Sequence, residues 1–491
     1  MEVKRIKPDF GEYEKLSRFH TLIPVCKETR LGCGDPMSTF RKLADMEHSF
    51  ILESVEKGGV SGRYTFMGFE PDVVISFNNG TVSILRKGNM RKIKTANPMG
   101  FLETYFKRHN SAQTRGMPPF SGGAVGYVGY DYIRYIENIP ATTLNDIKMP
   151  EYFFMIAKKV IIFDHAENCV KIINNSSPGA DLKSSYSRAV SEIEALEDIV
   201  MNPRTAPRGI RVKPACDFES NITRKQFCDS VIKAKDYIRQ GEIFQIVLSQ
   251  RLKTSLGVPP FTVYQALREI NPSPYMFYLK MGRNYLIGSS PETHVKVIGE
   301  NITIRPIAGT RGRGKDKKED KFLEKNLLAD EKEKAEHLML VDLARNDLGR
   351  VARIGSVRVD EFMKVLKYSH VMHIESNVIG KMAEGRSRFD VFTASFPAGT
   401  VSGAPKIRAM ELINELEPTR RGTYAGAVGY FSFSGNMDTC ITIRTILIKG
   451  NDVYVQAGAG IVADSVPARE YNETLNKARA MMEALSGGGG R

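Results

Sequence analysis

The alternation of apolar and polar residues predicts two clusters of strands along the chain. Turn signals such as Asn78-Asn79-Gly80 separate some of the strand-like runs. In the first part, strands are predicted at residues 73–77, 82–87, 153–163 and 170–174. In the second part, strands are predicted at residues 243–251, 275–280, 285–287, 294–297, 302–306, 425–433, 440–448 and 453–457.

Helical patterns fall in blocks between these strands. Thr223 and Gln226 form a capping-box pattern at the start of one helix. The apolar residues that follow lie on one helical face: Phe227, Val231, Ala234 and Ile238. Further helices are predicted at residues 186–200, 320–350 and 467–485. Clustered strands with blocks of helix between them favour an α+β fold with mainly antiparallel sheets.

A segment rich in proline and arginine, residues 201–222, divides the chain and is interpreted as a connector. A length of 491 residues exceeds that of one ordinary core. We therefore predict an N-terminal region at 1–200 and a second domain at 223–487. The pentapeptide GAVGY occurs at 123–127 and again at 426–430, and the sequence leaves open whether this is a repeat or a coincidence.

The composition is that of a globular protein, with 42% hydrophobic and 26% charged residues. No apolar run reaches the ~18 residues that a membrane span needs, and the first residues lack the apolar core of a signal peptide. Six scattered cysteines without a CxxC pair favour a reducing cytoplasm. The net charge of +14 has the sign of a nucleic-acid binder, but it is spread thinly, so we expect neither nucleic acid nor membrane as a partner.

Two pairs of glutamates suggest a metal site: Glu333 with Glu336, and Glu470 with Glu473. Each pair has i, i+3 spacing in a predicted helix, so its members share a face. If the two faces meet, carboxylates ~4 Å apart repel by about 4 kcal/mol at an effective dielectric of about 20, and a proton or cation must neutralise them. An all-oxygen site suits Mg²⁺ together with an anionic substrate. The alternative is that such pairs occur by chance on solvated helices.

Eight long motifs carry a resemblance to the chorismate-binding enzymes. They are GEIFQIVLSQR (241–251), SSPE (289–292), RPIAGTRGRG (305–314), AEHLMLVDLARNDLGR (335–350), YSHVMHIES (368–376), FPAGTVSGAPK (396–406), CITIRT (440–445) and QAGAGIVADS (456–465). ILES (51–54) and GRYTFMGFEP extend the resemblance to nearly the whole chain from about residue 20. The family implies large antiparallel β-sheets packed as a sandwich with flanking helices.

Two positions separate the members of this family. Members that add water to chorismate carry a lysine where this chain has Gln245, and a neutral amide cannot be the general base that water needs. Ammonia is already nucleophilic, so Gln245 fits an amine-adding enzyme. In aminodeoxychorismate synthases a lysine typically attacks the ring where this chain has Ala308. The resemblance thus implies amination of chorismate followed by pyruvate elimination, with amination alone as the alternative.

The resemblance also assigns residues to the chemistry. Glu292 matches the general acid that protonates the leaving hydroxyl, and His373 matches the group that acts in the elimination. Gln245 and Thr400 complete the candidate catalytic residues. Mg²⁺ is implied at Glu336 and Glu473 with two further carboxylates nearby, those of Glu333 and Glu470. Substrate contacts are implied for Gly309, Thr310, Tyr424, Arg444, Gly458, Ala459, Gly460 and Lys477.

Two regulatory or catalytic partners follow from the same resemblance. A separate glutamine amidotransferase subunit, contacting the N-terminal region, is expected to supply ammonia. L-tryptophan is expected to inhibit from a pocket formed by Ser54, Pro274, Tyr275 and Met276. A purely structural role is the alternative for each residue, and a self-contained glutaminase using Cys33 with His373 and Glu375 is an alternative ammonia source.

Overall fold

Two 12-stranded sheets form the body of the protein in the computed structural model, which describes residues 6–30, 35–55, 61–202, 217–367 and 371–487. The first sheet has the order β1 (Ile23–Arg30), β10 (Cys169–Ser176), β9 (Lys159–Asp164), β3 (Ser61–Phe69), β2 (His48–Val55), β13 (Tyr275–Met281), β14 (Asn284–Ser290), β23 (Thr445–Lys449), β24 (Asp452–Ile461), β12 (Gln245–Ser255) and β11 (Glu219–Ser220), with β20 (Gly403–Ala404) beside β12. The second has the order β17 (Ile307–Gly312), β19 (Val371–Lys381), β16 (Asn301–Ile304), β15 (Thr293–Ile298), β22 (Met437–Ile441), β21 (Ala427–Ser432), β7 (Gly123–Val128), β8 (Tyr152–Ala157), β4 (Val73–Asn78), β5 (Thr81–Arg86) and β6 (Asn89–Lys94), with β18 (Arg358–Lys367) beside β19.

The two sheets pack face to face. Alternate residues of a strand point to opposite faces, so one set of side chains lies between the sheets and the other set lies on the outer face. Phe50 and Phe277 of the first sheet share one buried cluster with Val125 and Val428 of the second. The next residue along β2, Ile51, belongs instead to a cluster on the outer face. The predicted sandwich of large antiparallel sheets with flanking helices is therefore confirmed.

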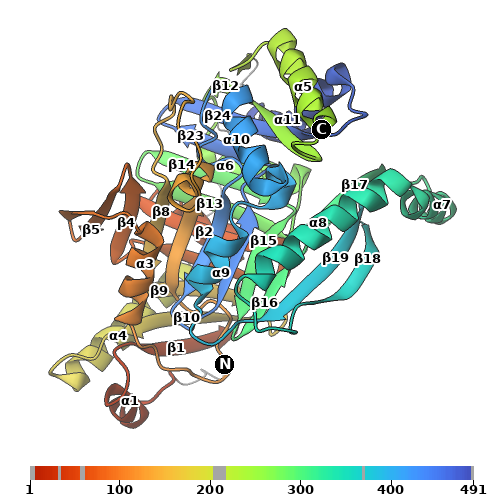
Figure 1. Cartoon of the computed structure of the whole chain (residues 1–491). Coiled ribbons are helices and arrows are strands. Elements are labelled where there is room, and N and C mark those ends of the chain that lie inside the picture. Colours follow the sequence, from red (N-terminus) through yellow and green to blue (C-terminus); the bar gives the residue numbers. More distant parts are fainter. Residues whose placement is uncertain (1–5, 31–34, 56–60, 203–216, 368–370, 488–491) are drawn as a thin grey trace.

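Helices cover both outer faces of the sandwich (Figure 1). The outer face of the first sheet packs with α1 (Phe10–Ser17), α2 (Pro36–Leu43), α4 (Leu182–Met201), α6 (Pro260–Ile270) and α11 (Pro467–Leu485). The other outer cluster includes α3 (Pro98–Lys107), α5 (Arg224–Arg239), α8 (Glu331–Gly349), α9 (Arg388–Ser395) and α10 (Lys406–Leu416). None of the helices in the described ranges is both long enough and apolar enough to cross a membrane.

The two halves of the chain share both sheets. β2 pairs with β13 in the first sheet, and β7 pairs with β21 in the second. The two GAVGY segments lie in β7 and β21, where Gly126 faces Gly429. Outward from the central pairs, strands of the two halves follow in matching chain order: β3 and β14, β9 and β23, β10 and β24, β1 and β12. This order supports a repeat rather than a coincidence.

The predicted boundary between residues 1–200 and 223–487 is therefore crossed by strand pairing in both sheets. Residues 203–216 of the predicted connector lie outside the described part of the chain. The two-region division stays a prediction.

Three predicted elements are each two elements in the structure. The strand predicted at 153–163 is interrupted at Lys158, and the helix predicted at 320–350 is α7 (Lys317–Ala329) followed by α8. Asp330 starts α8, because its side chain accepts hydrogen bonds from the backbone N–H groups of Lys332 and Glu333. The strand predicted at 440–448 is interrupted before Thr445, where Arg444 has a φ of 50°.

Candidate active site

The candidate site lies where β12 and β24 pair, with α8 on one side and α11 on the other. Gly458 and Gly460 of β24 lie opposite Ser249 and Val247 of β12. At the start of β12, Gln245 donates a hydrogen bond from Nε2 to Glu336 Oε1 on α8, at 2.9 Å. This contact brings α8 to the glycine-rich part of β24.

α11 reaches the same part of β24 through Lys477. Its Nζ lies 3.0 Å from the carbonyl oxygen of Gly458 and 2.7 Å from Glu473 Oε1. Burial raises the pKa of Glu470. The positive charge of Lys332 on α8 partly offsets this rise, so α8 also lies near Glu470. The two glutamate pairs therefore flank one stretch of β24, rather than lying on opposite sides of the molecule.

The four glutamates provide only oxygen donors, which is the set that suits a hard divalent cation. Burial raises the pKa of Glu333, and the neighbouring Glu336 carboxylate adds to this effect. Arg311 donates to Glu333 Oε1 at 3.3 Å and offsets part of the negative charge. Within the described residues, no three His, Cys, Asp or Glu side chains are close enough together to hold an ion. The donor chemistry fits Mg²⁺, and the shared metal site stays a prediction.

Glu292 has the properties of a carboxyl group that can donate a proton near neutral pH. It is only 9% exposed, and burial raises its pKa to about 7, although Thr400 and Lys477 both lower it. Thr400 Oγ1 is buried and makes no hydrogen bond of standard geometry within the described structure. Thr400 and Glu292 nevertheless line the same small cavity, so the two side chains are neighbours.

His373 lies on β19, and its Nδ1 is 2.7 Å from the carbonyl oxygen of Gly309 on β17. Donation from Nδ1 to this carbonyl leaves Nε2 as the basic nitrogen. Burial lowers the pKa of His373, and the positive charges of Arg444 and Lys477 lower it further. The neutral, proton-accepting form of this imidazole is therefore favoured near pH 7.

Gly309 has a φ of 66°, and a Cβ added there would lie 3.1 Å from Glu333 Oε2. The backbone of β17 thus approaches the acidic face of α8, which a glycine permits. The next residue, Thr310, belongs to β17, but its side chain is not among those described.

Arg444 and Tyr424 supply donors beside β24. Arg444 donates from Nη1 to the carbonyl oxygen of Lys477 at 2.8 Å, which holds the guanidinium against α11. Burial raises the pKa of Tyr424 to about 12, so its hydroxyl remains a donor at neutral pH. Arg444 and Tyr424 also shift each other's pKa, so the two side chains are neighbours. A guanidinium with an adjacent phenol is suited to binding a carboxylate.

A buried ion pair between Arg421 and Glu417, which sequence reasoning missed, packs against Tyr424. Arg421 donates from Nε and Nη2 to Glu417, at 2.9 and 2.6 Å. Its guanidinium lies 4.7 Å from the ring centroid of Tyr130 and 5.6 Å from that of Tyr424. Arg421 also donates to the carbonyl oxygen of Val247 on β12. No periodicity or motif marked this pair, because TRRG reads as a polar loop.

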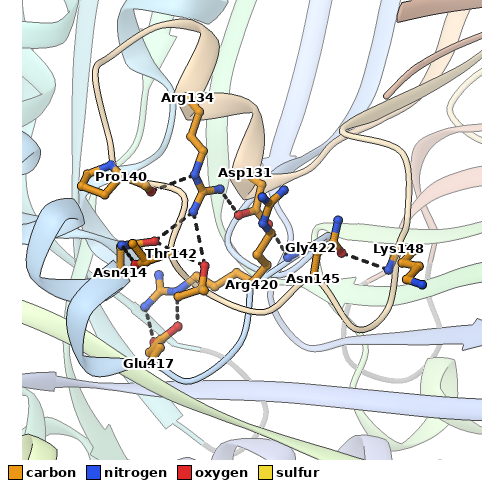
Figure 2. A network of polar contacts seen from close by, with 12 residues as sticks. Asp131, Arg134, Pro140, Thr142, Asn145, Lys148, Asn414, Glu417, Arg420 and Gly422 are labelled. Carbon is orange, nitrogen blue, oxygen red and sulfur yellow. Dashed lines mark hydrogen bonds and ion pairs between the residues drawn. The ribbon is translucent and has the colours of Figure 1, made fainter. Parts of the chain in front are cut away.

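The segment that contains this pair is also held by the N-terminal half of the chain (Figure 2). Asp131 Oδ2 accepts a hydrogen bond from the backbone N–H of Gly422 at 2.8 Å. Arg134 contacts Asp131 and donates to Asn414 Oδ1 at 3.1 Å. Figure 2 shows Arg134 and Asp131 facing Asn414 and Arg420 across this contact. The position of Tyr424 therefore depends on both halves of the chain.

Replacing Gly458 with alanine is expected to lower kcat/KM by an amount equivalent to about 1–3 kcal/mol. A Cβ there would lie 2.6 Å from Tyr424 Oη and 3.0 Å from the carbonyl oxygen of Leu248, so the phenol must move. Gly349→Ala, at the end of α8, is the matched control, because a Cβ built there meets no heavy atom within 4 Å. Steady-state kinetics of both variants test this, and an equal loss in both would contradict it.

The four residues predicted to bind tryptophan lie close together. Ser54 ends the LES segment on β2, which pairs with β13, and Glu53 lies opposite Met276. The backbone N–H of Val55 donates to the carbonyl oxygen of Ser273, next to Pro274, at 3.0 Å. Tyr275 follows on β13.

The alternative glutaminase hypothesis involves Cys33 and His373. Cys33 lies outside the described residues, and His373 Nδ1 contacts the carbonyl oxygen of Gly309.

Comparisons with known proteins agree on one family. Residues 47–483 match the family described as chorismate binding enzyme. Anthranilate synthase component 1 of Acetivibrio thermocellus is 46% identical over 489 residues, 98% of this chain and 99% of the relative. Aminodeoxychorismate synthase component 1 of Bacillus subtilis is 42% identical over 450 residues, 91% of this chain and 94% of the relative. The crystal structure of anthranilate synthase component I from Streptococcus pneumoniae matches with a TM-score of 0.77 at 38% identity, covering 87% of this chain and 94% of that chain.

Proposed function

This chain belongs to the chorismate-binding enzymes, and from that membership we propose that it is the large component of an anthranilate synthase. It would convert chorismate and ammonia into anthranilate and pyruvate, the first committed step of tryptophan biosynthesis. Relatives named anthranilate synthase component 1 match it at 46% and 44% identity over nearly its whole length. The cytoplasm is the compartment we predict for this reaction.

The observation that carries the proposal is the position of Lys477, whose Nζ lies 3.0 Å from the carbonyl oxygen of Gly458 and 2.7 Å from Glu473 Oε1. Lys477 lowers the pKa of Glu292, of His373 and of Glu470. A candidate proton donor, a candidate proton acceptor and an acidic pair therefore lie within electrostatic range of one ammonium group next to Gly458. These are the groups that amination with loss of hydroxide, followed by elimination, requires.

In the proposed reaction, one carboxylate of chorismate binds the guanidinium of Arg444 and the hydroxyl of Tyr424. The backbone N–H groups of Gly458, Ala459 and Gly460 line the adjacent stretch of β24. When bound at Glu336 and Glu473, with Glu333 and Glu470 nearby, Mg²⁺ would hold the ring carboxylate and withdraw electrons from the ring. Each of these contacts fixes the ring relative to Glu292 and His373.

The chemical steps are assigned to two residues. Glu292 gives its proton to the ring hydroxyl, which leaves as water while the ammonia lone pair forms the new C–N bond, and the resulting ring ammonium loses one proton to solvent. His373 Nε2 then accepts the ring proton, the ring C–O bond breaks with its electrons on the oxygen, and the enolate that leaves takes up the proton from His373 to become pyruvate. Gln245 has no basic nitrogen and instead donates to Glu336, so water is not activated at that position.

The test is direct. The purified chain is incubated with chorismate, Mg²⁺ and an ammonium salt, and the products are followed by fluorescence and mass. Anthranilate with an equal amount of pyruvate supports the proposal. A non-aromatic amino product without pyruvate would instead support an aminodeoxychorismate synthase.

Aminodeoxychorismate synthase activity is the second candidate function, because the relative of that name from B. subtilis is 42% identical to this chain. Against it, the position from which a lysine would attack the ring is Ala308, a buried residue of β17 that pairs with Ile374 beside His373. An alanine has no nucleophile. The absence of an amine at residue 308 therefore favours direct attack by ammonia.

We further propose a glutaminase subunit as the ammonia source and tryptophan as the feedback inhibitor. The relatives are named component 1, which is a name given to one part of an assembly. The clustering of Ser54 with residues 274–276 at the junction between the two halves supports a single small-molecule pocket there.

A Ser54→Phe substitution is expected to abolish inhibition by tryptophan while kcat stays within about twofold of the unchanged protein. The added ring would occupy the space next to Ser54, whose Cβ is already only 2.8 Å from a Cβ built on Gly62. Ser54→Ala is the matched control and should retain inhibition. Tryptophan titrations of ammonia-dependent activity measure both. Loss of activity with unchanged sensitivity to tryptophan would argue against this pocket.

A further inference from the structure

The candidate general acid, Glu292, lines a small cavity. Its walls come from α8, from β15 and β16, and from the segment that leads into the 3₁₀ turn at residues 399–401. The cavity shares only Glu292 and Thr400 with the residues assigned above to catalysis and substrate binding. Its other lining residues have no role assigned above in the reaction.

Its size limits what it can hold. The cavity measures about 30 Å³, and a single water molecule needs roughly 10–15 Å³ on this scale. One or two waters fit, whereas a ring substrate does not. The cavity is thus large enough for water but for no larger ligand.

The lining of the cavity includes both a buried acid and an exposed base. Glu292 is 9% exposed, whereas Arg305 is an exposed residue. Two other titratable groups face it, Asp347 and His294. Asp347 accepts two hydrogen bonds from Lys406 Nζ at 2.8 Å.

His294 is also engaged, because Nδ1 contacts Thr439 Oγ1 at 3.1 Å and Nε2 contacts Ser395 Oγ at 3.2 Å. Burial lowers the pKa of His294 to about 3, so this ring stays neutral. Asp347 is paired and His294 is neutral, so Glu292 is the group at this cavity that can exchange a proton near neutral pH.

The proposed reaction gives such a cavity a task. Each turnover breaks the bond between the ring carbon and its hydroxyl oxygen, and the bonding electrons stay on the oxygen. The Glu292 proton forms the new O–H bond, so one water molecule is produced and Glu292 becomes a carboxylate. Ammonia adds through its lone pair, and the ring ammonium releases its extra proton to solvent on the substrate side. The Glu292 carboxylate, which is 9% exposed, regains a proton from solvent before the next turnover.

We propose that the cavity lined by Glu292 receives the water formed from the substrate hydroxyl and returns a proton from solvent to Glu292 past the exposed Arg305. This assignment rests on the proposed anthranilate synthase reaction. The route avoids the substrate side of Glu292, where the aminated ring still fills the site. It also keeps bulk water away from the ring, where water would compete with ammonia.

Filling and enlarging the cavity test this assignment. Ala344→Val adds two methyl groups from α8, and Ala398→Val adds them from the residue that precedes the 3₁₀ turn. Each is expected to lower the ammonia-dependent kcat about tenfold, below the full effect of losing an acid, with KM for chorismate within about twofold. The solvent deuterium isotope effect on kcat should rise, because proton return becomes rate-limiting.

Leu343→Ala is the matched control, since it disturbs the same wall but enlarges the cavity. Its kcat is expected to stay within about twofold of the unchanged protein, with an unchanged isotope effect. Thermal unfolding of each variant identifies any that fail to fold, and the two filling variants are independent of each other. A water molecule within hydrogen-bond distance of Glu292 in a crystal structure would add support.

Two failures are distinguishable. If the unchanged protein forms no anthranilate from chorismate and ammonium, the proposed reaction is wrong. If it forms anthranilate and both filling variants keep its kcat and isotope effect, the cavity assignment is overturned. A loss of kcat in Leu343→Ala equal to that in the filling variants would also overturn it, because packing alone would then explain the effect.

Discussion

Glu292→Gln is expected to lower kcat by about 10²–10⁴-fold, while KM for chorismate changes little. Glutamine keeps the size and the hydrogen-bonding capacity of the side chain but has no proton to give to a leaving hydroxyl. The effect should be seen in kcat because proton donation matters only in the transition state. Initial rates of anthranilate formation at saturating ammonium measure it.

The matched control is Glu300→Gln in the neighbouring turn between β15 and β16. Glu300 is exposed and pairs with Arg353 at 2.8 Å, and such a surface pair contributes little to stability. Its kinetic constants should be those of the unchanged protein. A Glu292→Gln variant that retained more than about a tenth of the activity would rule out Glu292 as the essential acid.

The same residue determines a pH dependence. Burial raises the pKa of Glu292 to about 7, so the protonated form predominates below this pH and is lost above it. We expect kcat to fall as the pH rises through about 7 in the unchanged protein. Glu292→Gln should lack this decline. A profile of kcat from pH 5.5 to 9, an interval of roughly two pH units around the pKa, checks it.

The sequence predicted whole elements well where local chemistry set their ends. α11 has the predicted bounds, Pro467–Leu485, because a proline begins the helix and an apolar face continues to its end. The capping box of Thr223 and Gln226 is confirmed. The break at Arg444 could not be predicted, because a φ of 50° in a non-glycine residue is imposed by tertiary contacts.

The candidate site was predictable as a set of residues but not as an environment. Motifs named Glu292 and His373, yet the pKa shifts that suit them to their roles come from burial, which depends on distant segments. The central place of Lys477, which contacts Gly458 and Glu473, likewise needs the packing of α11 on β24. The ion pair of Arg421 and Glu417 carried no pattern at all.

The free energy of unfolding is expected to fall by about 3–5 kcal/mol when Arg421 is replaced by methionine. Arg421 is 2% exposed and Glu417 6%. Removing the guanidinium leaves the Glu417 carboxylate buried without its counter-charge, and also leaves the carbonyl oxygens of Val247 and Val401 without a donor. Urea denaturation followed by fluorescence measures the loss.

Arg408→Met is the matched control, because Arg408 forms a similar ion pair with Glu411 at 2.7 Å but is 39% exposed. Its loss should be at most about 1 kcal/mol, since solvent screens an exposed pair. Adding Glu417→Leu to Arg421→Met should recover part of the stability by removing the uncompensated charge. Equal losses for Arg408→Met and Arg421→Met would show that burial does not set the strength of this pair. Because the guanidinium of Arg421 also packs against Tyr424, its loss should raise KM for chorismate even at temperatures where the variant remains folded.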